Sequence, residues 1–178
     1  MAAEPPARER ALGALTGLAL GDALGMPTQS MSPARIRRCY GTITGLRDAV
    51  AEQPIAPSVP AGSVTDDTEQ ALILAGLLID GGGRIDPHQL ADALLRWEDD
   101  MRARGSLDLL GPSTKLALER VRAGADPHCT GRQGTTNGAA MRVAPVGIAF
   151  SLSADGDALA RAVRASCLVT HDTRQGFE

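Results

Sequence analysis

The sequence predicts an all-α protein that folds as one domain, a helical bundle over residues 1–178. Three observations support this fold class. Apolar residues recur at three- and four-residue spacing along much of the chain, as they do on one face of a helix. Glycine, proline, serine and aspartate stand where such patterns begin and end. Aromatic residues make up only 2% of the 178 residues, whereas strands are usually richer in them.

The first predicted helix covers residues 8–24, where leucine and alanine form an apolar stripe. Gly13, Gly17 and Gly21 interrupt it at four-residue intervals. A glycine in a helix interior costs about 1 kcal/mol, so three of them need a reason. We expect that they let another backbone approach this helix closely.

A short helix is expected to follow, with Ser32 as its N-cap and Pro33 at its first position. Residues 41–62 have little periodicity and predict a long loop, of the kind that is usually functional or mobile. The remaining helical patterns are predicted over 66–80, 86–104, 112–123 and 154–169, with an apolar stretch at 139–150 that Pro145 interrupts.

Bulk composition excludes several classes of protein. The formal net charge is -3 and lysine and arginine form no dense block, which argues against a nucleic-acid partner. No apolar run approaches the ~18 residues of a membrane span, and the N-terminus lacks a signal-peptide pattern, so no membrane is expected and the predicted compartment is the cytoplasm. The three cysteines lack C-x-x-C spacing and are expected to be buried free thiols.

The segment "SVTDDTEQAL" at residues 63–72 places two adjacent carboxylates where a helical pattern begins. One interpretation is a helix start, with Thr65 or Asp66 as the N-cap and Glu69 completing a capping box. The other is half of a metal site, because a threonine hydroxyl and the carboxylates of Asp66 and Asp67 suit Mg²⁺ or Mn²⁺. Spacing alone somewhat favours the cap and leaves both interpretations open.

Three other segments carry polar groups that are unusual in a helical protein. "GLALGDALGMPTQ" at 17–29 has Asp22 between glycines near a helix end, which by itself indicates only a helix breaker. "GTTNGAAMR" at 134–142 offers hydroxyls, an amide and backbone N–H groups, as either an anion cradle or an ordinary Asn-Gly turn. "THDTR" presents His171, although a lone histidine is more often a packing residue.

In this order, the segments "GxxxGDALGMP", "TDDT", "GxxNGAAMRxxPxG" and "TH" resemble the ADP-ribosylglycohydrolase family, the relatives of dinitrogenase reductase-activating glycohydrolase. The resemblance covers about residues 10–174. It implies an all-α hydrolase that cleaves the glycosidic bond between the terminal ribose of ADP-ribose and an acceptor such as arginine or serine. It also implies two adjacent divalent cations, Mg²⁺ or Mn²⁺, and an ADP-ribosylated protein or small molecule as the substrate.

The resemblance also implies roles for particular residues. Asp66 and Asp67 would be catalytic and would hold the metal together with Thr65. The diphosphate and the nearby ribose would lie against the loop that follows residue 133, and His171 would contact the terminal ribose. The substrate-binding residues implied in this way are Gly111, Gly134, Thr135, Thr136, Asn137 and His171.

The sequence departs from the family pattern in two respects. Gln29 stands where many members have glutamate, and an amide cannot act as a base. Members also usually have nearly twice this length, with an Asp-rich motif in the second half that supplies further metal ligands. We therefore expect a truncated chain, weak or inactive alone, with an exposed apolar face that favours self-association. The alternative is a catalytically dead remnant or half-module that binds ADP-ribose or needs a partner chain.

Overall fold

The computed structural model describes residues 6–106, 110–150 and 156–177, and the all-α prediction is confirmed, because these ranges contain helices and loops but no strand. No helix in these ranges has both the length and the apolar character that a membrane crossing requires. The elements are α1 (Ala7–Gly25), the 3₁₀ turn η1 (Met26–Thr28), α2 (Pro33–Tyr40), α3 (Asp66–Asp80), α4 (Pro87–Ala103), α5 (Pro112–Arg122), α6 (Pro127–Thr130), α7 (Ala144–Ala149), α8 (Gly156–His171) and α9 (Arg174–Phe177).

Side-chain caps explain why several helices begin where they do. Ser32 Oγ accepts the N–H of Arg35 at 3.3 Å at the start of α2. Asp86 Oδ1 accepts the N–H of His88 at 2.8 Å at the start of α4. Both helices then have proline in the first turn, where the missing N–H costs nothing. The predicted starts of these two helices are therefore confirmed, together with their physical cause.

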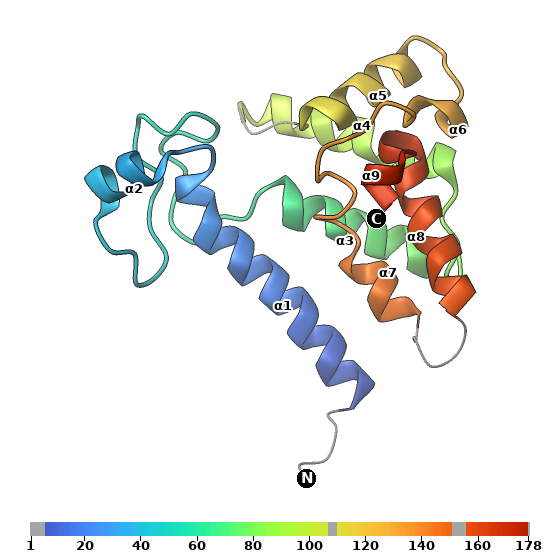
Figure 1. The fold of residues 1–178 in the computed structure, drawn as a ribbon, viewed down its shortest axis with the longest axis horizontal. Helices are drawn as coiled ribbons and strands as arrows, with labels where there is room; N and C mark the ends of the chain where they lie inside the picture. Colours follow the sequence, from blue (N-terminus) through green and yellow to red (C-terminus); the bar gives the residue numbers. More distant parts are fainter. Residues whose placement is uncertain (1–5, 107–109, 151–155, 178) are drawn as a thin grey trace.

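The apolar core lies between α3, α4, α5, α7 and α8. In Figure 1, α3 runs through the middle of this group, and α8 packs against α4, α5 and α7. A single cluster of buried side chains joins them, with Leu74 of α3, Leu94 of α4 and Val146 of α7 completely buried. Trp97 of α4 belongs to the same cluster, as its helical spacing predicted. This core fixes the position of the N-terminus of α3.

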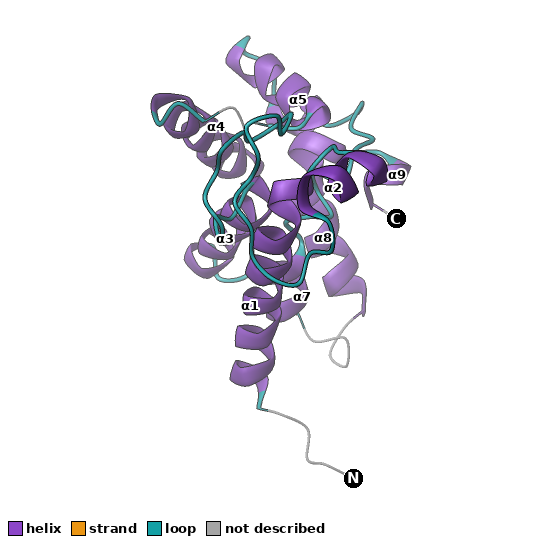
Figure 2. Cartoon of the chain, turned by 90° about the vertical axis from the view of Figure 1, so that its left-hand side faces the viewer, coloured by secondary structure: helices purple, strands orange, loops and turns teal. Residues whose placement is uncertain are grey.

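Helix α1 lies along the outside of this core as a long, largely exposed rod (Figures 1 and 2). Ala23 is its one buried residue, and Leu12 is 64% exposed. The expected close backbone approach at Gly13, Gly17 and Gly21 is wrong. Beyond the local helix, no described atom lies within 4 Å of the position that a Cβ would take at any of the three. The helix contacts α3 and α7, but not through these glycines.

The predicted loop at 41–62 is tied to η1 by two side chains. The Tyr40 hydroxyl donates to the carbonyl of Pro27 at 3.0 Å and accepts the N–H of Val50 at 2.9 Å. Gln53, which is only 2% exposed, donates through Nε2 to the carbonyl of Met26 at 3.2 Å. The loop and the end of α1 therefore form one connected unit beside the N-terminus of α3 (Figure 2).

The cysteines differ in burial more than their sequence context indicated. All three are free thiols, and Cys167 in α8 is buried, as expected. Cys39 is only partly buried, and Cys129 is exposed. The expectation of burial is therefore wrong for Cys129, because its helix, α6, has only four residues and buries Pro127 and Thr130 instead.

Candidate active site

A cleft of about 870 Å³ opens where the C-terminal half of α1, the N-terminus of α3, the start of α5 and the loop at 131–143 meet. It joins segments that lie far apart in the sequence. The predicted site residues that line it are Asp66, Asp67, Gly111, Thr136 and Asn137. Thr65, Gly134, Thr135 and His171 do not line it and lie in its surroundings.

Asp22, near the end of α1, fixes the N-terminus of α3. Its Oδ2 accepts the backbone N–H of Thr65 at 2.8 Å and that of Thr68 at 3.2 Å. The hydroxyls of the same two threonines donate to it as well, Thr68 to Oδ2 at 2.6 Å and Thr65 to Oδ1 at 2.7 Å. A carboxylate thereby occupies the place where N–H groups lack partners inside the helix and the helix dipole favours negative charge.

Thr65 is the N-cap of α3, so the helix-start interpretation of the motif is confirmed. Its Oγ1 accepts the N–H of Asp67 at 3.4 Å and lies 3.4 Å from Asp67 Oδ2. The side chain is buried, at 2% exposure, behind the acidic pair. The predicted capping box does not form, because the Glu69 carboxylate accepts Trp97 Nε1 at 2.5 Å and pairs with Arg104 instead.

Asp66 and Asp67 are the first two residues of α3, and both face the cleft. Asp66 is 9% exposed and accepts Gln70 Nε2 at 3.4 Å. Asp67 is half-buried, and its burial, followed by the nearby charge of Asp22, raises the pKa of its carboxyl group above the ordinary 3.8. The acidic wall therefore concentrates negative charge that a cation in the cleft would offset.

The opposite wall is the loop at 131–143, and Ser113 of α5 holds its backbone. Ser113 Oγ accepts the N–H of Thr135 at 3.2 Å and that of Thr136 at 3.3 Å. The N–H of Gly134 donates to the carbonyl of Gly131 at 3.0 Å. The N–H groups of residues 134–136 therefore all donate within the protein, and recognition of a diphosphate by this loop stays a prediction. The side chains of Thr136 and Asn137 line the cleft.

Close packing against α8 requires glycine at three positions of this loop, Gly131, Gly134 and Gly138. A Cβ at Gly134 would lie 2.0 Å from the carbonyl oxygen of Thr170. A Cβ at Gly138 would lie 2.9 Å from both His171 Cε1 and Thr114 Oγ1. No real Cβ contact is that short, so a larger residue would push the loop away from α8 and into the cleft.

His171 is fully buried behind this wall. Its side chain is 0% exposed and does not line the cleft, and the contact with a ribose stays a prediction. Its Nε2 lies 3.0 Å from Thr136 Oγ1, and its Nδ1 lies 2.8 Å from Thr170 Oγ1. Burial, and then the charge of Arg142, lower the pKa of His171 to about 4, so the ring is neutral at pH 7.

Arg142 is the centre of a buried polar network behind both walls. Its side chain is 0% exposed and donates to Gln70 Oε1 at 3.2 Å, to the carbonyl of Gly138 at 2.8 Å and to Thr170 Oγ1 at 2.5 Å. Gln70 in turn donates to Asp66. Burial lowers the pKa of Arg142 to about 10, which leaves it charged at pH 7. Asp66 and Thr136 are thus linked through one chain of hydrogen bonds.

Arginine can only donate, so Thr170 Oγ1 accepts from Arg142. The neutral His171 ring carries one proton, and either ring nitrogen can hold it, because Nδ1 and Nε2 each lie beside a threonine hydroxyl that can donate or accept. In the tautomer with the proton on Nε2, His171 donates to Thr136 Oγ1, and the Thr136 hydroxyl keeps its own proton as a donor.

Sequence reasoning missed Asp22 and Arg142 as site-forming residues. Asp22 was recognised only as a helix breaker, although its glycine-flanked segment was singled out. Arg142 is the one charged residue of the apolar stretch 139–150, and this position was the available signal of a buried guanidinium. Gln29, the position where a glutamate was expected, lines the cleft from the end of η1.

Comparisons with known proteins find one family. The family model described as ADP-ribosylglycohydrolase matches residues 3–178. ADP-ribosylarginine hydrolase Tri1 of Pseudomonas putida is 35% identical over 151 residues, which cover 80% of this chain and 36% of that protein. ADP-ribosyl-[dinitrogen reductase] glycohydrolase of Rhodospirillum rubrum is 32% identical over 154 residues, which cover 82% of this chain and 46% of that protein.

A solved structure of an "ADP-ribosylglycohydrolase-related protein complex" superposes on the chain with a TM-score of 0.69 and 34% sequence identity. The match covers 96% of this chain and 52% of that one. The chain spans half or less of the length of the curated relatives that it matches.

Proposed function

The chain belongs to the ADP-ribosylglycohydrolase family, and from that premise we propose that it binds the ADP-ribosyl group of a modified substrate in the cleft and hydrolyses its glycosidic bond. The observation that carries this proposal is the juxtaposition of Asp66 and Asp67 with Thr136 and Asn137 across one cleft of about 870 Å³. A cavity of this size suits a ligand as large as ADP-ribose.

The donor set fits a hard divalent cation, Mg²⁺ or Mn²⁺. Asp66 and Asp67 offer carboxylate oxygens, which such ions prefer, and the raised pKa of Asp67 marks a place where negative charge lacks compensation. We propose that these two residues hold the cation, with Thr65 Oγ1 next to Asp67 as a further oxygen. A pair of cations, as the family resemblance implies, would supply a water of lowered pKa close to the sugar.

On the opposite wall, we assign recognition of the diphosphate and ribose to side chains. With the His171 proton on Nε2, the Thr136 hydroxyl would accept from His171 and donate into the cleft. The Asn137 amide offers both a donor and an acceptor beside it. His171 is in this account a positioning residue, because it acts on the ligand only through Thr136.

The reaction needs stabilisation of positive charge on the ribose. Glycosidic cleavage passes through a state with oxocarbenium character, which the adjacent carboxylates of Asp66 and Asp67 would stabilise. Gln29 can orient a water molecule by hydrogen bonding but cannot take up its proton. We propose ADP-ribosyl-arginine as the first substrate to test, because the similar protein Tri1 is named an ADP-ribosylarginine hydrolase.

A second candidate function is binding without turnover, which the sequence also left open. The acids that line the described cleft are Asp22, Asp66 and Asp67, and Asp22 is occupied by four hydrogen bonds. Two carboxylates would leave a cation with mostly water ligands. In this alternative, the chain binds ADP-ribose as a half-module, or needs a partner chain that completes the metal site.

The release of free ADP-ribose from ADP-ribosyl-arginine, with and without Mg²⁺, separates the two candidates. Hydrolysis by the wild-type chain that is lost in Asp66→Asn/Asp67→Asn supports the hydrolase. Asp80→Asn is the matched control, because Asp80 is an exposed acid at the far end of the same helix. ADP-ribose binding without any release, from a folded sample, supports the half-module, and the absence of both would overturn the proposal.

The predicted self-association has a candidate surface on α1. Leu12, Leu20 and Leu24 of this helix are 64%, 53% and 44% exposed. We propose that a second copy of the chain covers these leucines. Sedimentation velocity should then show a dimer that Leu12→Glu/Leu20→Glu dissociates, and a wild-type monomer would exclude it.

A further inference from the structure

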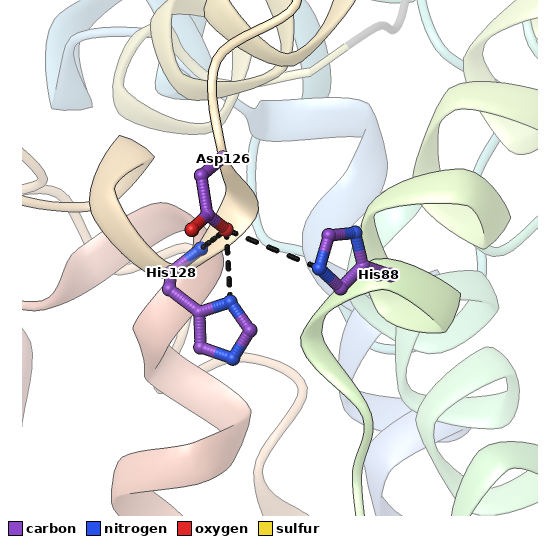
Figure 3. A group of neighbouring side chains, drawn as sticks. All are labelled: His88, Asp126 and His128. Atoms are coloured by element: carbon purple, nitrogen blue, oxygen red, sulfur yellow. Dashed lines mark hydrogen bonds and ion pairs between the residues drawn. The ribbon is translucent and has the colours of Figure 1, made fainter.

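A second group of possible metal ligands lies outside the cleft, where the first turns of α4 and α6 meet. It consists of His88 from α4 and of Asp126 and His128 from the start of α6 (Figure 3). All three residues are exposed, and one ligand atom of each lies within 4.8 Å of the other two. In Figure 1, α6 and the start of α4 lie on the side of the molecule opposite the N-terminus of α3.

The three side chains converge on one oxygen atom. Asp126 Oδ1 lies 2.8 Å from His128 Nδ1 and 3.9 Å from His88 Nε2. The two imidazole rings stand edge to face with their centroids 5.4 Å apart. Figure 3 shows both rings directed toward the carboxylate from different helices. The convergence therefore depends on the packing of two segments, and not on local spacing alone.

These distances fit a single small cation after minor rotation of side chains. Bonds of about 2.0–2.2 Å in tetrahedral geometry separate neighbouring ligand atoms by about 3.3 Å. The 2.8 Å separation between Asp126 Oδ1 and His128 Nδ1 is shorter than this, and the 3.9 Å separation between Asp126 Oδ1 and His88 Nε2 is longer. The side chains of His88, Asp126 and His128 are 62%, 60% and 51% exposed, which leaves them room to rotate.

We propose that His88, Asp126 and His128 form a surface site for a divalent transition-metal ion, with Zn²⁺ as the reference ion. Two imidazoles and one carboxylate form a donor set that suits zinc, copper and nickel, whereas Mg²⁺ prefers oxygen ligands and water. Three protein ligands leave a further position of the ion for water or another ligand. This site is independent of the cleft and of its oxygen ligands.

Zinc at this position would connect two helices that otherwise meet only through packing. Asp126 is the N-cap of α6, where its Oδ1 accepts the N–H of His128 at 2.9 Å. His88 lies in the first turn of α4, directly after the Asp86 cap. A metal that binds only the folded chain raises its stability by mass action. We therefore expect zinc to stabilise the contact between α4 and α6.

Zinc binding is measured by calorimetric titration of the full chain without a histidine tag, in excess Mg²⁺ so that oxygen sites in the cleft are occupied. One zinc ion per chain is expected, and Tm should rise with Zn²⁺ but not with more Mg²⁺. His88→Ala and His128→Ala should each weaken zinc binding by at least about ten-fold, the loss that follows even when outer partners of a metal site are removed. Both substitutions are at exposed positions, so the variants should fold.

Three control variants distinguish this site from other sources of zinc binding. Asp100→Asn removes an exposed carboxylate from the other end of α4 and should leave zinc affinity unchanged. Cys129→Ser removes the exposed thiol beside His128 and should also leave it unchanged. Asp66→Asn/Asp67→Asn should retain the site.

The proposal is overturned if both histidine variants bind zinc as tightly as the wild type. It is also overturned if binding disappears only in Cys129→Ser, or if the wild type binds no zinc. In that last case, the three side chains serve only as the cap of α6 and its ring contact with α4.

Discussion

The two walls of the cleft are organised by charges of opposite sign, one partly buried and the other fully buried. On the acidic wall, the partly buried Asp22 carboxylate accepts four hydrogen bonds from the first turn of α3. Behind the loop wall, the Arg142 guanidinium donates three hydrogen bonds, and its Nε is the one buried side-chain nitrogen or oxygen without a partner among the described residues. One wall is held by an acceptor and the other by a donor.

This difference shows how each wall can present the opposite chemistry to a ligand. The first turn of α3 directs its donors back to Asp22, and Asp66 and Asp67 can then face the cleft as acceptors. Arg142 is itself part of the loop wall and binds acceptors from α3, the loop and α8, namely Gln70, Gly138 and Thr170. Because a charged group that is removed from water needs all of its partners, changes at Asp22 and Arg142 should have larger effects than changes at Thr136 or Asp67.

The largest effect is expected from Arg142→Met. It removes the only donor that Gln70 Oε1, the Gly138 carbonyl and Thr170 Oγ1 share in a fully buried site. Unfilled buried acceptors are costly, so the free energy of unfolding should fall by roughly 3–5 kcal/mol in urea titrations. Arg37→Met, at an exposed position of α2, is the control. A loss of less than about 1 kcal/mol for Arg142→Met would contradict a central role for this side chain.

Acid sensitivity is the next largest expected effect and arises from His171. The pKa of its ring falls from 6.5 to about 4 on folding, so between these values the unfolded state binds more protons and stability decreases as pH decreases. Relative to His171→Gln, the wild type should lose up to roughly 3 kcal/mol between pH 6.5 and pH 4. Urea unfolding of both proteins across this range measures it. If the free energies of unfolding of the two proteins changed with pH in parallel, a buried neutral ring at His171 would be contradicted.

On the acidic wall, Asp22→Ala should destabilise the protein by roughly 2 kcal/mol, because the charged acceptor of four donors is lost. Asp22→Asn retains one acceptor oxygen, so its free energy of unfolding should fall by about half as much. Thermal or urea unfolding of the two variants tests this order. If both variants matched the wild type, Asp22 would not be the group that holds α3.

A smaller effect is expected at the surface of the loop wall. Thr136→Val removes a hydroxyl that bonds His171 and faces the cleft. Stability should fall by about 1 kcal/mol or less, and ADP-ribose affinity by roughly five-fold. Thr135→Val is the matched control, because the exposed Thr135 side chain does not line this cleft. Equal affinities of the two variants would remove Thr136 from the ligand site.

The smallest expected change in the free energy of unfolding should have the opposite sign. Burial and Asp22 raise the pKa of Asp67, so its ionised form costs stability at pH 7. Asp67→Asn should therefore not destabilise the chain without Mg²⁺, although it should abolish any stabilisation by Mg²⁺. Thermal melts with and without Mg²⁺ report both quantities. Destabilisation without metal would mean that Asp67 serves the fold and not a ligand.

The sequence predicted the acidic wall better than the loop wall. The start of α3 and the positions of Asp66 and Asp67 follow from a local cap and an apolar repeat. The long-range hydrogen bonds of both walls could not be predicted in this way. Asp22 bonds to Thr65, which lies 43 positions away, and Arg142 bonds to Gln70, which lies 72 positions away. The motif also does not show that Thr136 lines the cleft while the ring of His171 is buried beside it. Such pairings arise only from packing.

The same limit applies to α1 and to the surface histidines. The glycines of α1 were interpreted as a close-packing face, but the helix lies largely free of the core. His88 and His128 are 40 positions apart, and only the contact between α4 and α6 joins them through Asp126.

The most direct test of the proposed ligand site is a calorimetric titration of ADP-ribose into the folded chain, with and without Mg²⁺. The account predicts binding that depends on Mg²⁺, is lost in Asp66→Asn/Asp67→Asn and is retained in Asp80→Asn. Binding that is equally strong without Mg²⁺, or that survives in the double variant, would contradict the assignment of the first turn of α3 as the cation site.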